Sequence, residues 1–519
     1  MNCPPDAGAP TPPTLAGLRR RFALRTDQDI GDRHLTGVHL DNRMVRPGDL
    51  FAALPGAKTH GAQFAAQAIE QGAVAVLTDD DGARRIGPAG VPVLIADDPR
   101  GVLGAIAAWI HHEPATRLGM YAVTGTNGKT TTTYLVEYLL RALGRQTGMI
   151  GTVELKIGAD RTPARLTTPE APALHQLLAD METAGVDDVV MEVSSHALAL
   201  HRVDGVGYDV VGFTNLTQDH LDFHGDLEGY YRAKAALFTP QRARRGVVLV
   251  DDAYGRRLAT EAGIEVVTVS ATGADADWQI QERDQISGGS AFTLRHRSGE
   301  QLRTSVGLPG GFNVANAALA LVMVIEAGVP PGELAEVLPA GLAPAVPGRM
   351  ERVAEAPRVL VDFAHNTDAL REAMAALRAD TAGRLFVIFG ATGERDAGKR
   401  GAMGRVAIEE ADVVIVTDDD PHDEDPATIR RQVMSGALTA LTEAQRRGRS
   451  VELYEIAPRQ TAIRRAVRFA AAADTVLVAG RGHETWQEIA GVDHYLDDRQ
   501  EVRAAMADRQ QRRPGSGQA

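Results

Sequence analysis

The first residues that could do chemistry form a glycine-containing loop, TGTNGKTT, at residues 124–131. An apolar run precedes the loop and an amphipathic pattern follows it, so we expect a strand, a turn and a helix. Gly125 and Gly128 would let backbone N–H groups converge on an anion at the positive end of that helix. Lys129 could bridge phosphates and Thr130 could bind Mg²⁺. The stretch therefore predicts a site for a magnesium-bound nucleotide.

This loop departs from the common phosphate-binding pattern G-x-x-x-x-G-K-[ST], because its two glycines stand three positions apart instead of five. The alternative is a plain strand-to-helix turn that happens to contain a lysine. The strand and the helix expected on either side favour the nucleotide loop.

Acidic and imidazole side chains follow two later apolar runs. MEVSSHALALHR places Glu192 at the end of one run, and TNLTQDHLDFHG supplies Asp219, His220, Asp222 and His224. Each of them alone could be a solvated loop residue. Because carboxylate oxygens are ligands that Mg²⁺ prefers, the set together with the loop predicts a metal–nucleotide site that includes Glu192 and His220.

The composition is that of a soluble globular protein with several domains. A chain of 519 residues is too long for one core, and we expect three domains. The 68 acidic residues outnumber the 55 basic ones, which argues against a nucleic-acid partner, because such binding neutralises phosphates with Lys and Arg. The single cysteine, Cys3, excludes an intramolecular disulfide and fits a reducing compartment, so we expect a cytoplasmic protein.

The termini and the apolar runs argue against secretion and against a membrane partner. The proline-rich N-terminus lacks the apolar core of a signal peptide, and no later run of 18 apolar residues could span a bilayer. The polar residues 509–519 predict a disordered tail. We expect a monomer that acts on small molecules.

Alternating apolar runs and helical patterns predict an α/β protein with three domains. Residues 1–116 predict a small α/β domain, and residues 117–345 predict a central ATP-binding domain whose mainly parallel strands are linked by helices. After the proline-containing stretch PAVPGRM, residues 346–508 repeat a strand–loop–helix rhythm typical of a Rossmann-like sheet. In such sheets the chemistry lies at the carboxyl ends of the strands.

Seven motifs, in this order, resemble those of the Mur ligase family of ATP-dependent amide-forming enzymes: GTNGKTT, MEVSSH, TNLTQDHLDFHG, GGFNVANAALA, PGRME, VDFAH and GRGHE. Four further stretches resemble its UDP-N-acetylmuramoyl-tripeptide synthetase, or MurE-type, branch: DNRMVRPGDLFAAL, YYRAKAALF, FGATGERDAGKR and TDDDPHDEDP. The resemblance covers nearly the whole chain. It implies an N-terminal domain for the UDP end, a central ATPase and a C-terminal domain for the incoming amino acid.

The resemblance also implies a reaction in peptidoglycan precursor synthesis. ATP would phosphorylate the γ-carboxylate of UDP-N-acetylmuramoyl-L-alanyl-D-glutamate, and the amine of a diamino acid would then attack the acyl phosphate. A free carboxylate resists that attack, because it repels the amine and would have to expel oxide, whereas an acyl phosphate expels phosphate. Lys129 and Mg²⁺ would offset the charge that develops during phosphoryl transfer.

Lys234 in YYRAKAALF matches the position that carries a carbamate, made from lysine and CO₂, in this branch. An N6-carboxylysine is an anion and would hold a second Mg²⁺. The alternative is an ordinary surface lysine on a helix. The implied catalytic residues are Lys129, His220 and Lys234, and the implied metal ligands are Thr130, Glu192, His220 and the modified Lys234.

The resemblance assigns candidate contacts to ATP and to the UDP-linked substrate. The ATP contacts are Gly125, Thr126, Asn127, Gly128, Lys129, Thr130, Thr131, Asn313, Asn316, Arg349 and Asp362. For the two asparagines the alternative is helix capping. The contacts to the UDP-linked dipeptide are Asn42, Lys58, Thr59, Thr167, Thr168, Ser194 and Arg202. An arginine suits a carboxylate or a diphosphate.

The stretch TDDDPHDEDP, residues 417–426, bears on the choice of amino acid. In enzymes of this branch that add meso-diaminopimelate the matching stretch reads D-N-P-R, and its arginine grips the distal carboxylate. Here His422 takes the place of that arginine, and Asp420 takes the place of the asparagine.

A mostly neutral imidazole cannot form that clamp. Six acidic residues in the stretch would repel a distal carboxylate and attract a distal ammonium, although they could also form a solvated loop. We therefore expect L-lysine, with meso-diaminopimelate or L-ornithine as alternatives. The implied amino-acid contacts are Arg395, Asp419, Asp420, His422, Gly480 and Glu484.

Two rival functions remain open at this stage. Folylpolyglutamate synthase shares the phosphate loop and the acyl phosphate chemistry but lacks a UDP-binding domain, and residues 1–116 argue against it. A nucleotide-binding module without catalysis would have lost part of the metal shell, whereas Lys129, Thr130, Glu192, His220 and Lys234 are all present.

Overall fold

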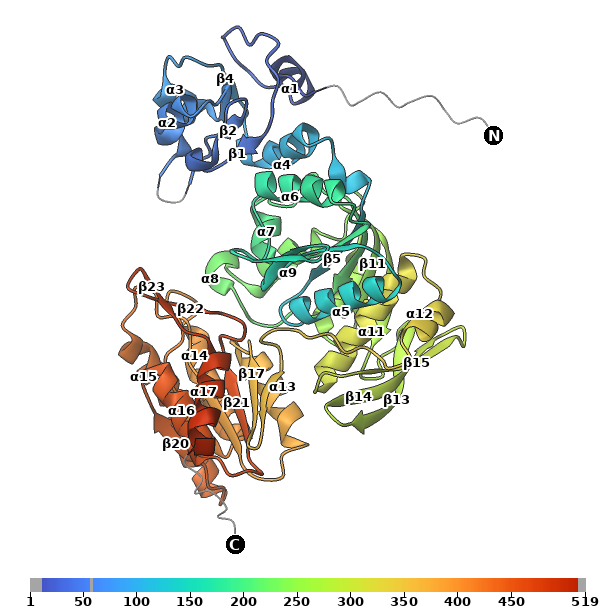
Figure 1. Cartoon of the computed structure of the whole chain (residues 1–519), viewed down its shortest axis with the longest axis vertical. Helices are drawn as coiled ribbons and strands as arrows, with labels where there is room; N and C mark the ends of the chain where they lie inside the picture. Colours follow the sequence, from blue (N-terminus) through green and yellow to red (C-terminus); the bar gives the residue numbers. More distant parts are fainter. Residues whose placement is uncertain (1–11, 57–58, 512–519) are drawn as a thin grey trace.

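The computed structural model of the chain describes residues 12–56 and 59–511. Three sheets follow one another along the chain, and helices cover them (Figure 1). Cys3 and Lys58 lie outside the described residues. No helix in the described part of the chain combines the length and the apolar character needed to cross a membrane.

The N-terminal sheet has four parallel strands: β1 (Val38–His39), β2 (Leu50–Ala52), β3 (Ala75–Thr78) and β4 (Val93–Ile95). Its helices are α1 (Leu15–Arg21), α2 (Ala65–Glu70), α3 (Asp80–Ile86) and α4 (Pro99–Ile110). Helix α4 packs against α6 (Ala171–Thr183) of the central part. An ion pair between Arg100 and Glu170, 3.3 Å apart, lies at the same junction.

The central sheet has eleven strands in the order β15-β14-β13-β12-β11-β10-β5-β9-β6-β7-β8. Seven of them are mutually parallel: β5 (Gly119–Thr124), β6 (Thr147–Ile150), β9 (Asp188–Glu192), β10 (Tyr208–Phe213), β11 (Ala243–Leu249), β12 (Glu265–Ser270) and β13 (Trp278–Ile286). Antiparallel strands extend both edges: β7 (Glu154–Ile157), β8 (Asp160–Pro163), β14 (Gly289–His296) and β15 (Gln301–Val306).

Strand β5 lies inside this sheet and is covered on both faces, which explains its continuous apolar sequence. Tyr121 and Val123 pack with α5 (Lys129–Ala142) and α11 (Gly311–Glu326) on one face. Met120 and Ala122 pack on the other face with α6 and α9 (Leu227–Ala235). The remaining helices are α7 (Ser195–Ala199), α8 (Leu221–His224), α10 (Ala253–Glu261) and α12 (Pro331–Val337).

The third sheet has six strands in the order β16-β17-β21-β18-β19-β20. They are β16 (Glu351–Glu355), β17 (Arg358–Asp362), β18 (Leu385–Phe389), β19 (Val413–Val416), β20 (Glu452–Glu455) and β21 (Thr475–Ala479), and only β16 is antiparallel. Helices α13 (Thr367–Arg378), α14 (Gly398–Glu410) and α15 (Pro426–Arg446) cover one face. Helices α16 (Arg459–Phe469) and α17 (Asp498–Gln511) cover the other.

A hairpin of β22 (Trp486–Ile489) and β23 (Val492–Tyr495) follows β21. The predicted fold class, an α/β protein with a mainly parallel central sheet and a Rossmann-like C-terminal part, is confirmed. Helix α17 continues to Gln511, three residues into the predicted tail, and residues 512–519 lie outside the description. The exact domain boundaries stay predictions.

Candidate active site

The phosphate loop leaves β5 and enters α5, as its sequence predicts. Gly125 has φ +146° and Gly128 has φ +89°, and a Cβ atom at Gly125 would lie 1.9 Å from Thr214 Oγ1. Only glycine fits both the backbone angles and the close approach. The loop is tied to residue 215, because Thr126 N donates to Asn215 O at 2.8 Å and Asn127 N donates to Asn215 Oδ1 at 3.0 Å.

Lys129 folds back over the loop, where its Nζ donates to Gly125 O at 3.0 Å and to Thr126 O at 2.9 Å. Burial lowers its pKa. The next residue, Thr130, donates its hydroxyl to Glu192 Oε2 at 3.0 Å. Neighbouring ligands of an octahedral Mg²⁺ lie about 3 Å apart, so the spacing of these two oxygens fits a shared cation.

Glu192 is held from two directions at the end of β9. Thr152 N donates to its Oε1 at 2.8 Å, and the Thr152 hydroxyl donates to its Oε2 at 3.0 Å. Because Thr130 also donates to Oε2, this oxygen lies between Thr152 and the loop that joins β5 to α5. Thr152 was not among the predicted residues, because a threonine after an apolar run carries no distinguishing signal.

Lys234 on α9 is buried, with a relative exposure of 1%. Its Nζ donates to Gly125 O at 2.7 Å and lies 4.5 Å from the centre of the Tyr230 ring. Burial, followed by the charge of Lys129, lowers the pKa of Lys234 well below its usual value. The surface-lysine alternative is therefore wrong, because this amine is buried against the phosphate loop.

His220 begins α8 with a left-handed backbone, φ +54°. Burial lowers its pKa to about 3, so the ring is neutral near pH 7. The neighbouring Asp219 faces the third sheet, with His365 Nε2 at 3.4 Å and Lys399 Nζ at 3.7 Å from its carboxylate oxygens. Burial opposes its charge, but these two groups hold the pKa of Asp219 well below its usual range.

The predicted metal ligands lie around the loop without forming a complete shell. Thr130 and Glu192 are in contact, and Lys234 reaches the loop from α9. Across residues 12–56 and 59–511, no three His, Cys, Asp or Glu side chains come together as a metal-binding group.

The linker that precedes β16 brings Arg349 to the phosphate loop. Its Nη2 donates to Thr130 Oγ1 at 3.1 Å, and its guanidinium lies 4.3 Å from the centre of the Phe363 ring. Asp362 accepts from Met350 N at 2.6 Å and from Ala364 N at 2.8 Å. Asp362 thus fastens the linker to the end of β17.

Asn313 and Asn316 are buried in the first turns of α11. The helix begins at Gly311, and its N-cap residue, Gly310, makes no side-chain cap, so the capping alternative is wrong for both asparagines. Asn313 Nδ2 donates to Pro309 O at 2.8 Å and closes the turn that leads into the helix. Asn316 faces the loop, since a Cβ atom at Gly128 would lie 2.4 Å from its Oδ1.

Several residues predicted to contact the UDP-linked substrate hold the chain in place. Ser194 Oγ accepts from Ala197 N at 3.1 Å and caps α7, and the fully buried Thr168 donates to Glu192 O at 2.8 Å. Arg202 pairs with Glu170 at 2.8 Å. In the N-terminal part Asn42 Nδ2 donates to Gln67 Oε1 at 2.8 Å.

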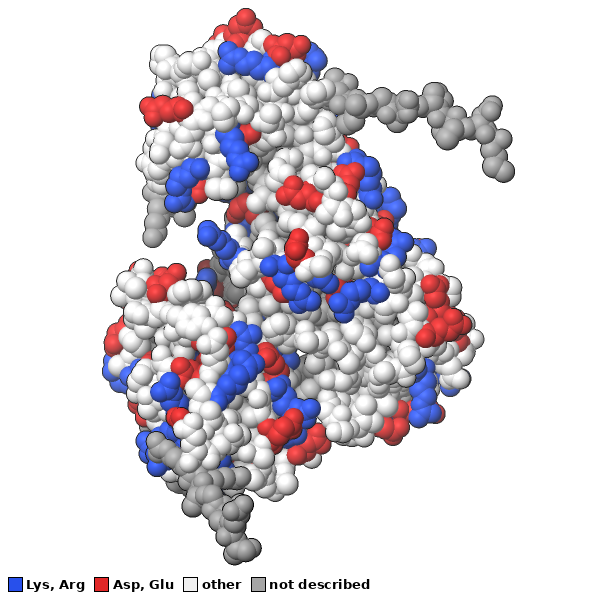
Figure 2. Space-filling model, in the orientation of Figure 1, with Lys and Arg blue, Asp and Glu red and all other residues white. Residues whose placement is uncertain are grey.

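A cleft of ≈ 1510 Å³ joins the central and third parts. Figure 2 shows an open notch at the left edge of the molecule between its N-terminal and third parts, bounded on the right by the central part. The predicted residues that line the cleft are Thr126, Asn127, Gly128, Lys129, Thr130, Thr131, Thr167, Glu192, Ser194, His220, Asn313, Asn316, Arg349, Asp362, Arg395, Asp420 and Glu484. The other described candidates lie outside its lining: Asn42, Thr59, Gly125, Thr168, Arg202, Lys234, Asp419, His422 and Gly480.

Two of the predicted amino-acid contacts, Asp420 and Glu484, lie beside a buried arginine, Arg481, just after β21. Its side chain is fully buried and donates to Asp420 Oδ1 and to Trp486 O. Glu484 Oε2 lies 3.8 Å from the same guanidinium. Burial raises the pKa of Glu484 to about 8, although Arg481 opposes the shift. Arg481 belongs to the GRGHE motif but was not among the predicted contacts.

The acidic run after β19 is largely neutralised within the fold. Asp418 pairs with Arg430, Asp420 pairs with Arg481, and Glu424 pairs with Arg400 at 2.8 Å. Asp425 caps α15 by accepting from Thr428 N at 3.0 Å. The open acidic field, one of the two grounds for the lysine prediction, is therefore wrong for Asp418, Asp420 and Glu424.

His422 has a left-handed backbone, φ +50°, and bridges to the β22–β23 hairpin. Its Nδ1 lies 3.0 Å from Glu488 Oε2, and its backbone N donates to Glu488 O at 3.2 Å. The hairpin thus holds the loop in which the arginine of the D-N-P-R pattern is replaced by histidine.

A second buried arginine, Arg459 on α16, fixes the two strand ends that carry these contacts. Arg459 and Asp498 are both fully buried, and their side chains pair at 2.7 Å. Arg459 also donates to Asp418 O at 3.1 Å and to Ala479 O at 2.8 Å. It therefore sets the spacing of the loops after β19 and β21. Its position in a charged helical segment gave no sign of this role.

Comparisons with known proteins match the chain along most of its length. Models described as "Mur ligase family, catalytic domain", "Mur ligase middle domain" and "Mur ligase, glutamate ligase domain" match residues 34–110, 123–324 and 348–482. A relative from Streptomyces avermitilis, named UDP-N-acetylmuramoyl-L-alanyl-D-glutamate--2,6-diaminopimelate ligase, is 47% identical over 506 residues, or 97% of this chain and 98% of its own.

A relative from Leifsonia xyli subsp. xyli, named UDP-N-acetylmuramyl-tripeptide synthetase, is 44% identical over 497 residues, with 95% of both chains covered. A solved structure of a UDP-N-acetylmuramoyl-L-alanyl-D-glutamate--2,6-diaminopimelate ligase is 31% identical with a TM-score of 0.66. That similarity covers 96% of this chain and 100% of the solved one.

Proposed function

Since this chain belongs to the Mur ligase family, in its MurE-type branch, we propose that it adds meso-2,6-diaminopimelate to UDP-N-acetylmuramoyl-L-alanyl-D-glutamate. The enzyme is an ATP-dependent ligase of peptidoglycan synthesis. The observation that carries the choice of amino acid is the 47% identity, over 97% of the chain, to a relative named for 2,6-diaminopimelate. The expected L-lysine finds no such support.

The residues of the loop suit the first half of this reaction. A γ-carboxylate oxygen of the substrate attacks the terminal phosphorus of ATP, and ADP leaves. Lys129 would exchange its bonds to the loop carbonyls for bonds to the phosphates, and Arg349 would add a second cation. Thr130 and Glu192 would hold Mg²⁺, which neutralises phosphate charge when it is bound.

The third sheet suits the second half. The amine of the amino acid attacks the acyl carbon, phosphate leaves, and the proton of the new amide nitrogen passes to water. Glu484 is placed to receive an ammonium group, because its carboxylate lies in the cleft and is more basic than an ordinary glutamate. Arg395, exposed in the same cleft, is available for a carboxylate of the amino acid.

We further propose that Lys234 carries a carbamate. CO₂ reacts with a neutral amine, and burial lowers the pKa of Lys234 toward that form. Lys234 lies beside Gly125 O in the phosphate loop. The carbamate would replace its buried positive charge with a negative one, and a second Mg²⁺ could bind there.

The carbamate is tested by ¹³C NMR of the enzyme equilibrated with ¹³C-bicarbonate. We expect a carbamate signal that is lost in Lys234→Arg. Lys156, which is also buried but pairs with Glu137, provides the matched control, and Lys156→Arg should keep the signal. A spectrum without the signal in the wild-type enzyme would refute the modification.

The amino acid is tested by phosphate release with ATP, Mg²⁺ and UDP-N-acetylmuramoyl-L-alanyl-D-glutamate. We expect meso-diaminopimelate to give the highest kcat/KM, above L-lysine and L-ornithine. A higher value for L-lysine would overturn the choice of amino acid and leave the ligase reaction standing. Phosphate release with a folate acceptor only would support the folylpolyglutamate synthase. No release with any acceptor would support the nucleotide-binding module without catalysis.

L-lysine is the second candidate, and one observation favours it. His422 stands in the position of the clamp arginine and is engaged by Glu488, so it offers no two-pronged donor to a distal carboxylate. The monomeric state also stays a prediction.

A further inference from the structure

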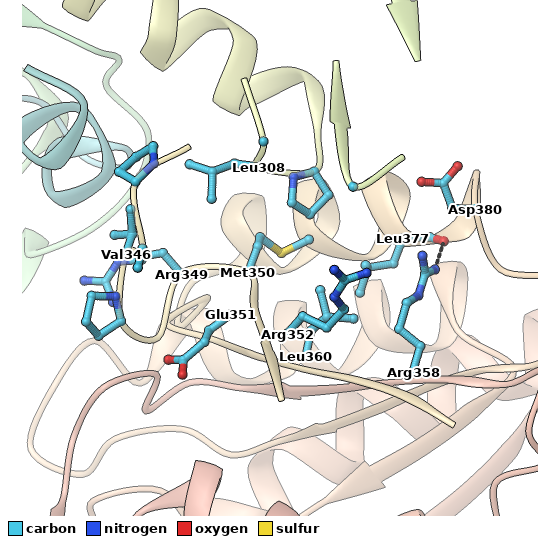
Figure 3. A pocket seen from close by; sticks show the side chains of 16 residues that line it. Leu308, Val346, Arg349, Met350, Glu351, Arg352, Arg358, Leu360, Leu377 and Asp380 are labelled. Carbon is cyan, nitrogen blue, oxygen red and sulfur yellow. Dashed lines mark hydrogen bonds between the residues drawn. The ribbon is translucent and has the colours of Figure 1, made fainter. Parts of the chain in front are cut away.

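A second hollow, of ≈ 270 Å³, lies between the central and third parts, on the other side of the linker from the large cleft. Figure 3 shows it between the chain that follows β15 and the elements β17 and α13. Its wall is mainly apolar and includes Leu308, Pro309, Val346, Met350, Leu360 and Leu377. By liquid volume the hollow has room for about nine water molecules.

The linker separates this hollow from the nucleotide cleft and forms a wall of both. Arg349 turns to the nucleotide side, where it donates to Thr130 Oγ1. Met350, the next residue, faces the hollow in Figure 3, and its backbone N is bonded to Asp362. Any occupant of the hollow would therefore touch the same short segment that brings Arg349 to the phosphate loop.

Positively charged residues outnumber negatively charged ones at the hollow. Its lining includes three arginines, Arg349, Arg352 and Arg358, and two carboxylates, Glu351 and Asp380. Arg352 pairs with Glu355 at 3.3 Å. Arg358 uses its guanidinium only for oxygens of neutral groups, on Leu377, Thr381 and Thr475. Within the described residues no carboxylate lies within 4 Å of Arg358. Asp380 stands at the same rim and is hydrogen-bonded by Gln285 at 3.2 Å. Burial lowers the pKa of Arg358 although Asp380 opposes this, which marks a cation with too little compensation.

We propose that this hollow binds a small amphipathic carboxylate of about ten non-hydrogen atoms, with its apolar body against the leucines and its carboxylate on Arg358. Apolar walls with one or two placed charges are typical of small-molecule sites, and an arginine is well suited to a carboxylate. The ligand would touch both parts of the chain and would stabilise the arrangement in which Arg349 reaches the loop.

The probe is 3-phenylpropionate, titrated into the full-length enzyme and followed by isothermal calorimetry. We expect saturable binding, at least tenfold weaker for the neutral 3-phenylpropanamide. Equal affinity for the acid and the amide, or no saturable binding, would overturn the proposal. Because the readout is binding and not turnover, the result is independent of the amino acid that the enzyme uses.

Two variants locate the site. Arg358→Gln should weaken binding about tenfold, while Arg384→Gln, on the same sheet and already paired with Asp474, should leave it unchanged. Leu308→Phe should narrow the hollow and weaken binding severalfold, while Leu338→Phe, in the same core cluster and outside the hollow, should leave binding unchanged. Unchanged binding in Leu308→Phe would overturn the proposal even if Arg358→Gln fails to fold.

Discussion

The phosphate loop and the amino-acid loops do their work through different kinds of contact. In the phosphate loop a short run of residue types is sufficient to form the site. Gly125 and Gly128 permit the turn, and Lys129 bonds to carbonyls three and four residues earlier in the chain. The loops after β19 and β21 depend on ion pairs between distant residues, such as Asp420 with Arg481. A local pattern can therefore predict the first region, whereas the second exists only in the folded chain.

This difference explains where the residue-level predictions succeeded and where they failed. The run of acidic residues suggested an open negative surface, but the fold brings Arg400, Arg430 and Arg481 to it from two helices and a later loop. Charges in a sequence are thus a poor guide to the field at a site until their partners are known.

The largest effect is expected at a pair of residues distant in the sequence, Arg459 and Asp498, which holds the amino-acid loops. Replacing Arg459 in Arg459→Met leaves Asp498 as an uncompensated buried charge, and we expect a loss of about 3–5 kcal/mol in the free energy of unfolding. Calorimetry of the unfolding transition measures it. Arg464→Met, which removes a half-exposed partner of Glu501 on the same helix, should cost less than about 1 kcal/mol. Equal effects of the two variants would show that the buried pair does not hold the strand ends.

The next largest effect is expected at the phosphate loop. Lys129→Ala should lower kcat by about 10²–10³-fold, because a positioned cation is lost from the phosphoryl transfer. The far-UV circular dichroism should stay unchanged, since the loop is also held by Asn215. Phosphate release within threefold of the wild type would contradict the role proposed for this lysine.

A smaller change would sharpen the comparison at the amino-acid loop. His422→Arg introduces a possible two-pronged donor, and we expect the ratio of kcat/KM for meso-diaminopimelate to that for L-lysine to rise about tenfold. Competition between the two amino acids in one assay measures the ratio. His494→Arg, on the exposed strand β23, is the control and should not alter it. No change in either variant would mean that residue 422 does not meet the distal group.

The smallest effect is a pH dependence that comes from Glu484. With a pKa of about 8 in the free enzyme, its carboxylate is about one-tenth ionised at pH 7 and about nine-tenths ionised at pH 9. The anion attracts an ammonium group, so KM for the amino acid should fall severalfold between these values. Glu484→Gln should flatten the profile. A wild-type KM that rises over this interval would contradict the assignment.

The fold class and the core of the phosphate site could be predicted, because both follow from local patterns. Parallel strands that are buried on both faces have continuous apolar sequences. The glycines, the lysine and the threonine of the phosphate loop act within one short segment, so their contacts follow from the local sequence. The contact between Thr130 and Glu192 was also within reach, since the carboxyl ends of neighbouring parallel strands meet at one edge.

The remaining contacts could not be predicted for identifiable reasons. A serine that caps a helix cannot be told from a serine that binds a substrate by its residue type. The capping role of Ser194 could therefore not be predicted from the sequence. Arg459 lies in an arginine-rich segment that looks like a solvated helix, and only the packing of α16 on α17 buries it. Asp362 was assigned to ATP, yet its oxygens accept from the backbone of the linker.

The bonds from residue 215 to the phosphate loop have a consequence for ligand recognition. Fixing the backbone of a free loop costs about 1–2 kcal/mol for each residue, and here Thr126 and Asn127 are immobilised before any nucleotide arrives. The entropy of ordering these residues has already been lost during folding. A triphosphate, or an inhibitor of similar shape, should therefore bind to a loop that is already in its bound conformation. Its affinity should depend little on loop flexibility.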